Sequence, residues 1–178
     1  YSNTDDNNIR VFRKGILSHY DTKNKAILHY NLDSIEINES RVVKYIWQIN
    51  YKLAILWKSC TNDELISTLL LRLNGANTGF LEHHIEWSES AIFSDSLYNV
   101  CSGKKFAPVE YLEMFSASEL MGVYQLPMKL LKPLKEYFPD LNVLGMTSKK
   151  DSNFVVVEPN TILLNKVVDA MSKLYGTR

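Results

Sequence analysis

The sequence predicts an α+β fold: an antiparallel sheet in the N-terminal third capped by an amphipathic helix, then a more helical half with a β-hairpin and a C-terminal helix. Three observations carry this prediction. Apolar residues alternate over residues 43–57, helix start and stop signals bracket residues 61–75, and prolines interrupt a helical pattern over residues 108–138. Alternation with a period of two is typical of a half-buried strand, whereas a helix repeats about every 3.6 residues.

Length and composition predict one domain. We expect a flexible polar tail over residues 1–8 and a single α+β domain over residues 9–178, because 46% hydrophobic residues in 178 suffice for a core. No apolar run reaches the roughly 18 residues of a membrane span, since Lys52 and Lys58 interrupt the richest stretch. Two cysteines do not make a disulfide framework, so we expect an intracellular protein, in the cytoplasm or nucleus, without a membrane partner.

The first sixty residues are rich in β signals. The stretches GILSHY and KAILHYNL flank DTKNK, a polar insert typical of a hairpin turn, and SIEI continues the β character. Every second residue from Val43 to Trp57 is apolar, which predicts one long strand, or two strands that meet at a bend near Asn50, with one buried face. We therefore expect Trp47 and Trp57 to be buried on the same side of the sheet.

Residues 61–75 carry the strongest helix signals. Thr61 and Glu64 have the spacing of a capping box, in which each side chain satisfies an amide of the other residue. Gly75 is suited to the left-handed conformation just past a helix end. The apolar positions between them form one broad stripe, made of Leu65, Ile66, Leu69, Leu70, Leu71 and Leu73. This stripe predicts packing against the sheet.

The later part of the chain is predicted to be mostly helical. Residues 108–138 carry helical signals that are broken at Pro127, Pro133 and Pro139, so LPMKLLKPLKEYFPD is predicted to form two short helices or one kinked helix. The segments NVLGMTS and NFVVVE predict a hairpin around residues 149–152. The segment NTILLNKVVDAMSKLYG, which opens on Asn160 and ends at Gly176, predicts a terminal helix.

The stretch FLEHHIEW, residues 80–87, is a candidate strand with metal-binding side chains. As a strand it would place Glu82, His84 and Glu86 on one face and His83 on the opposite, apolar face. Two carboxylates and an imidazole suit manganese, iron or zinc and could supply a general base, so a metal-dependent hydrolase is one alternative. We assign no metal ligand, because a solvated strand face explains the pattern and further donors have no familiar spacing: His19, His29, Cys60 and Cys101.

Signatures of catalysis are missing from the sequence. The glycine-rich phosphate loops, the dinucleotide fingerprint and the nucleophile elbow do not occur. Cys60 is expected to be a buried thiol, whereas the lysines that follow Cys101 in CSGKK would lower the pKa of an exposed thiol. We therefore predict no catalytic residue and no cofactor.

Charge gives one further alternative. The net charge is zero, but residues 1–60, 61–120 and 121–178 carry +3, −6 and +3. A nucleic-acid-binding domain could use the basic pairs Lys104/Lys105 and Lys149/Lys150 on phosphates, with Phe106 stacking on a base. The zero net charge supplies no general attraction for a polyanion, so this stays an alternative.

The leading interpretation is a non-catalytic interaction domain. The chain has 10 tyrosines and 3 tryptophans, residue types that are favoured in binding hot spots, and it lacks a chemical motif. We therefore expect a protein-binding domain of a larger intracellular, eukaryotic protein that acts as an adaptor or complex-assembly subunit.

Overall fold

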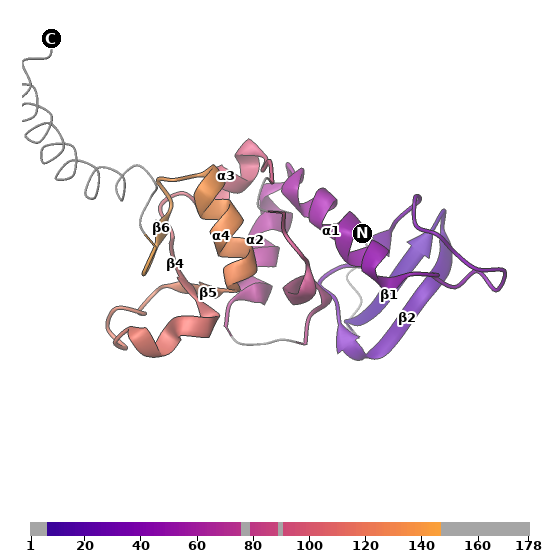
Figure 1. Ribbon diagram of the computed structural model, residues 1–178, viewed down its shortest axis with the longest axis horizontal. Coiled ribbons are helices and arrows are strands. Elements are labelled where there is room, and N and C mark those ends of the chain that lie inside the picture. The colour runs from indigo at the N-terminus through magenta and orange to yellow at the C-terminus, as the bar shows by residue number, and fades with distance from the viewer. Residues whose placement is uncertain (1–6, 76–78, 89–90, 147–178) are drawn as a thin grey trace, which may run out of the picture. The chain divides into compact units, whose positions relative to one another are not determined.

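The computed structural model describes residues 7–75, 79–88 and 91–146 (Figure 1). The chain divides into two units, residues 1–144 and 145–178, and the account below concerns the first. The hairpin around residues 149–152 and the helix over residues 160–176 lie outside the described residues. The tail over residues 1–8 and the single domain over residues 9–178 stay predictions.

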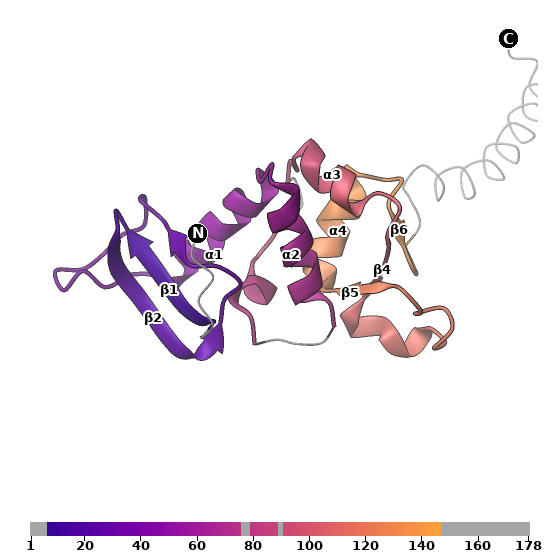
Figure 2. The same cartoon turned by 180° about the vertical axis from the view of Figure 1, so that it is seen from behind.

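The α+β class is confirmed. The elements follow one another as β1 (Asn8–Arg13), β2 (Ile16–Lys25), β3 (Tyr30–Asn31), α1 (Ile46–Lys58), α2 (Asp63–Leu73), the 3-10 helix η1 (Leu81–His84), α3 (Asp95–Cys101), β4 (Lys105–Pro108), the 3-10 helix η2 (Val109–Met114), β5 (Tyr124–Leu126), α4 (Met128–Tyr137) and β6 (Asn142–Val143). In both ribbon views α2 lies between α1 and α4 (Figures 1 and 2).

The N-terminal sheet has the order β2-β1-β3, with β1 antiparallel to β2 and parallel to β3. Its hairpin turn is at Lys14 and Gly15, whose φ angles of 49° and 79° lie in the left-handed region that glycine favours. The predicted turn at DTKNK was wrong. Asp21 instead folds a bulge inside β2, because its Oδ1 accepts the amides of Lys23 (2.8 Å) and Asn24 (3.3 Å).

The segment predicted as a long strand is the helix α1. Residues that alternate with period two can also be divided into two series, each with a spacing of four residues. Residues four apart lie on one face of a helix, so the two series fit two roughly opposite faces of a helix. One series, Ile49, Leu53 and Trp57, is buried in the core. Trp47 belongs to the other series and is 63% exposed, so the prediction that both tryptophans are buried in a sheet was wrong.

The loop before α1 keeps little of its predicted β character. Within it, SIEI contributes one isolated bridge, between Ile37 and Val43. The Val43 amide donates to the Ser18 carbonyl at 2.9 Å, which ties this loop to β2.

The helix predicted over residues 61–75 is confirmed as α2, but its cap differs. The Asn62 side chain accepts the Leu65 amide at 3.0 Å, so Asn62 rather than Thr61 is the N-cap. Gly75 has the predicted positive φ, 99°. The buried face of α2 is Ile66, Leu69, Leu70 and Leu73, whereas Leu71 is 62% exposed and does not widen it.

A second sheet, of order β5-β4-β6 with all strands parallel, occupies the later part of the unit and was not predicted. The proline-rich segment forms the single helix α4, with Pro127 as its N-cap residue and Pro133 buried inside it. Proline at a helix start loses no hydrogen bond, which explains where α4 begins.

Replacing the cap of α2 provides a test of its start. We expect Asn62→Ala to lower the free energy of unfolding by about 0.5–2 kcal/mol, because the Leu65 amide loses its acceptor. Thr61→Ala is the matched control and should change it by less than about 0.5 kcal/mol. Chemical denaturation measures both, and a larger loss at Thr61 would contradict the observed cap.

Fluorescence quenching separates the three tryptophans. Trp47 is 63% exposed, whereas Trp57 and Trp87 are 3% and 8% exposed. We expect Trp47→Phe to remove most of the emission that iodide quenches, and Trp57→Phe to leave that component in place. Equal loss in the two variants would place Trp47 in the core.

Candidate interaction surface

The exposed side of α1 is the candidate functional site. It consists of Trp47, Tyr51 and Ile55 on the helix, which are 63%, 57% and 41% exposed, and of Tyr45 just before the helix, which is 40% exposed; together they are called the α1 face below. The tilted rings of Tyr45 and Trp47 lie with centroids 6.2 Å apart. Single exposed apolar residues are normal on proteins, but an aromatic row of this kind on one helix is typical of a binding site.

Hydrogen bonds hold α1 in place at both ends. Near its start, the Gln48 side chain accepts the Glu36 amide at 2.8 Å and donates to the Glu36 carboxylate at 3.0 Å. At its end, the Lys58 carbonyl accepts the Ser94 amide at 2.8 Å. The α1 face is therefore carried by an anchored element, which reduces the entropy lost when a partner binds.

The α1 face is basic. Residues 41–58 contain Arg41, Lys44, Lys52 and Lys58 and no acidic residue. The Lys44 ammonium lies 5.1 Å from the centroid of Tyr45, and the Lys52 ammonium 5.7 Å from that of Tyr51. The Lys44–Glu36 pair, at 4.0 Å and solvent-exposed, contributes little. The charges therefore lie directly beside the aromatic rings.

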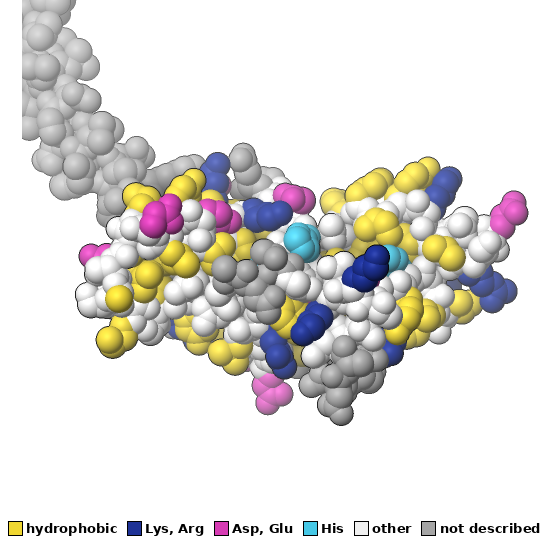
Figure 3. All heavy atoms as spheres, turned by 90° about the horizontal axis from the view of Figure 1, so that it is seen from below, with side chains coloured by type: hydrophobic (Ala, Val, Ile, Leu, Met, Phe, Trp, Pro, Cys, Tyr) yellow, Lys and Arg dark blue, Asp and Glu magenta, His cyan; other side chains and the backbone are white. Residues whose placement is uncertain are grey.

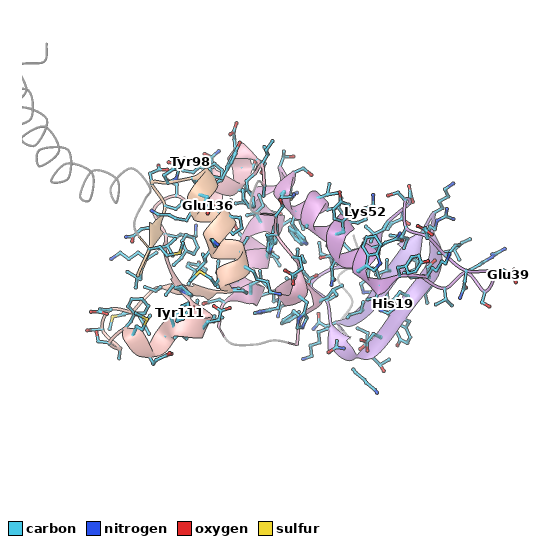
Figure 4. The ribbon with its side chains drawn as sticks, in the orientation of Figure 1. His19, Glu39, Lys52, Tyr98, Tyr111 and Glu136 are labelled. Carbon is cyan, nitrogen blue, oxygen red and sulfur yellow. The ribbon has the colours of Figure 1, made fainter. Side chains whose placement is uncertain are left out.

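In the view from below, Lys and Arg side chains are scattered among apolar ones over the whole face, and most of the acidic side chains in view lie over its left-hand half (Figure 3). Lys52 projects from α1, and Glu39 marks the outer end of the loop before it (Figure 4).

Beneath α1 lies a buried carboxyl group, that of Glu82, which is 1% exposed. Its Oε1 accepts the Ile27 amide at 3.0 Å and the Tyr30 hydroxyl at 2.5 Å. The same hydroxyl accepts the indole N–H of Trp57 at 3.1 Å. Burial raises the pKa of Glu82, and these hydrogen bonds offset only part of that rise.

The structure does not bring together the side chains of the metal-dependent alternative, Glu82, His84 and Glu86. Residues 81–84 form η1 rather than a strand, so the faces of a strand do not exist here. Glu82 points into the core, His84 is exposed, and Glu86 forms an exposed salt bridge with Lys129 at 2.9 Å. Among the described residues, no three His, Cys, Asp or Glu side chains cluster in a way that could hold a metal ion.

The remaining histidines are dispersed. His83 points inward, as predicted, and is 6% exposed. Burial lowers its pKa, and the neighbouring His84 lowers it further. His19 is on β2 (Figure 4), and its pKa is also lowered by burial, which the nearby Asp21 partly offsets. His29 stacks on Phe12, with ring centroids 6.5 Å apart.

The two cysteines differ in their exposure, and Cys60 is not buried as predicted. Cys101 is fully buried, and burial raises its pKa to about 12 although Lys104 acts in the opposite direction. The Lys104 ammonium donates to the Val100 carbonyl. Cys60, expected to be buried, is partly exposed and lines a hollow of about 310 Å³ between the end of α1 and the start of α2.

Phe106 cannot act as the base-stacking residue of the nucleic-acid-binding alternative. This side chain is fully buried in β4, so it cannot contact a base. Lys104 and Lys105 line a hollow of about 200 Å³ that also contains Asp140, which accepts the Tyr98 hydroxyl. Lys149 and Lys150 lie outside the described residues.

Comparison of the chain with protein-family models, with curated proteins and with solved structures found no match. In the part of the chain that the structure describes, none of the helices combines the length and apolar character needed to cross a bilayer.

Sequence reasoning missed the α1 face. The expectation of a strand placed Trp47 and Tyr51 in a core, although the fourfold spacing within the alternation was visible. A second signal was the lack of any acidic residue over residues 41–58. An amphipathic core helix usually carries both charge signs on its outer side, so a purely basic outer side with aromatic residues is unusual.

Glu82 provides a pH test of the network beneath α1. Because its pKa is raised above the ordinary 4.5 in the folded state, its stabilising contribution is complete below that value and is lost as pH rises through the folded pKa. The amide side chain in the variant Glu82→Gln cannot titrate, so we expect the free energy of unfolding of the wild type to fall relative to this variant as the pH rises above 4.5.

Tyr30→Phe tests the cause of that pH dependence. The Tyr30 hydroxyl donates to the carboxylate and favours its charged form, so its removal should extend the fall in stability to higher pH. Denaturation curves over the pH series measure both effects. If the free energies of unfolding of wild type and Glu82→Gln differed by the same amount at every pH, both predictions would be contradicted.

Proposed function

We propose that the chain is a non-catalytic protein–protein interaction domain of a larger intracellular, eukaryotic protein, in which it acts as an adaptor or complex-assembly subunit. The single observation that carries the proposal is the α1 face, where one helix exposes Trp47, Tyr51 and Ile55. Tryptophan and tyrosine are the residues that most often dominate binding energy, since each buries about 150–250 Å² in a contact.

The support for docking rather than chemistry comes from the described residues. The buried groups with altered pKa, Glu82, His83 and Cys101, lie in packed surroundings. Glu82 is engaged in tying α1 to β3 and η1, which is a structural role. Both cysteines are unpaired, as in proteins of reducing compartments.

A matched pair of variants tests the proposal. Trp47→Ser combined with Tyr51→Ser removes the centre of the α1 face, and Leu71→Ser changes an equally exposed apolar residue on α2 (62% against 63% for Trp47). We expect a stoichiometric protein partner to co-purify with wild type and with Leu71→Ser, and to be reduced at least tenfold in the double variant.

Unfolding curves accompany this experiment. The exposed side chains contribute little to the core, so the double variant should unfold within about 1 kcal/mol of wild type. Equal recovery of the partner from all three proteins would overturn the α1 face as the docking site, and recovery of no stoichiometric protein by wild type would overturn the interaction domain itself.

A further inference from the structure

We infer that the α1 face binds an acidic amphipathic helix of a partner protein. This inference rests on the proposed function and specifies the chemistry of the partner. It combines the geometry of the exposed row, the sign of the charge around it and the acidic side chains that flank it.

Geometry favours a helical partner. Trp47, Tyr51 and Ile55 repeat every fourth residue, so the row advances about 6 Å per step and about 12 Å in all. Apolar side chains three or four residues apart on a second helix advance by a similar distance. The backbone groups of α1 are used within the helix, so an extended peptide gains no strand pairing here and must bind through side chains alone.

Charge favours an acidic partner. Residues 41–58 carry four basic side chains and no acidic one, and two of the ammonium groups lie over Tyr45 and Tyr51. Carboxylates along the edges of an apolar stripe would meet these ammonium groups as the aromatic rings become buried. The same argument disfavours a symmetric contact between two copies, because an isologous interface brings identical surfaces together and opposes basic groups to basic groups.

The flanking loop favours a protein over an anionic lipid surface. Glu36 lies 4.0 Å from Lys44 beside the start of α1, and the exposed Glu39 lies at the outer end of the same loop (Figure 4). A flat anionic surface pressed against α1 would approach these carboxylates and be repelled. A helix of two or three turns contacts the apolar row without covering the loop.

Two synthetic peptides test the inference on the full chain. Both have 14 residues, with leucines spaced three and four apart, and the remaining positions are Glu-rich in one and Lys-rich in the other. Trp47 is the exposed tryptophan, so its burial shifts the emission to shorter wavelength. We expect the Glu-rich peptide to produce a saturable shift, absent in Trp47→Phe, and to bind at least tenfold more tightly than the Lys-rich one.

Charge reversal on the protein provides the matched control. Lys44→Glu combined with Lys52→Glu should weaken binding of the Glu-rich peptide at least tenfold, whereas Lys105→Glu, an exposed lysine on β4, should leave it within about twofold. Equal binding of the two peptides, no shift at about 1 mM Glu-rich peptide, or equal effects of the two sets of variants would overturn the inference.

Other occupants give distinct results. A larger shift of Trp47 emission with phosphatidylserine vesicles than with the Glu-rich peptide would replace the acidic helix by a lipid surface. An emission shift that grows with protein concentration alone would identify the occupant as a second copy of the chain. Protection of Trp47 from iodide in the dilute chain would identify the occupant as a segment of the same chain.

The failure of this inference is distinguishable from that of the proposed function. A co-purifying partner that is lost with Trp47→Ser and Tyr51→Ser but retained by the charge-reversed variant would leave the interaction domain standing and overturn the acidic helix alone. If no partner depended on Trp47 for binding, the proposed function itself would be overturned, and the acidic helix with it.

Discussion

The hydrogen-bond chain from Trp57 through Tyr30 to Glu82 is the constraint on which the arrangement of α1 depends. It joins a helix, a short strand and a 3-10 helix that are far apart in the sequence. Each group is buried, so the loss of any one would leave a polar partner unsatisfied, at a cost of about 1–3 kcal/mol. The inner face of α1 therefore has one packing arrangement, and the outer face has one orientation.

The two faces of α1 have separate roles because their residues follow different series. Ile49, Leu53 and Trp57 fill the core, and Trp47, Tyr51 and Ile55 lie outside it. A side chain of one series cannot reach the surroundings of the other series, since the two faces are roughly opposite on the helix. Fold stability and the proposed partner binding are thereby assigned to different residues of one element.

The sequence predicted those elements whose signals are local. The α2 helix is capped and ended by Asn62 and Gly75, and both lie within one turn of it. The α1 helix was predicted as a strand because its alternation is compatible with both structures, and the helix observed makes long-range contacts with Tyr30 and Glu36 that a local pattern does not reveal. Local signals could not reveal the second sheet, because its strands have two to four residues and pair in parallel across long connections.

The candidate site was hidden for the same reason. Whether Trp47 is core or surface depends on whether residues 43–57 are a strand or a helix, so an error in secondary structure removed the site from view. For residues 80–87 the same kind of error suggested an alternative site that the fold does not form. A strand would have aligned Glu82, His84 and Glu86, whereas the tighter turn of η1 sends Glu82 into the core and leaves Glu86 in solvent.

In the proposed interaction, the basic residues would give the α1 face its selectivity. An exposed aromatic row contributes little to stability and favours unspecific association through its apolar area. Lysines over Tyr45 and Tyr51 oppose that association, because each apolar contact with another basic surface then brings like charges together. The same lysines attract a surface of opposite charge. In the proposed interaction the arrangement discriminates by repulsion as well as by attraction, so charge and spacing together, rather than exposed area alone, would decide which partner the α1 face accepts.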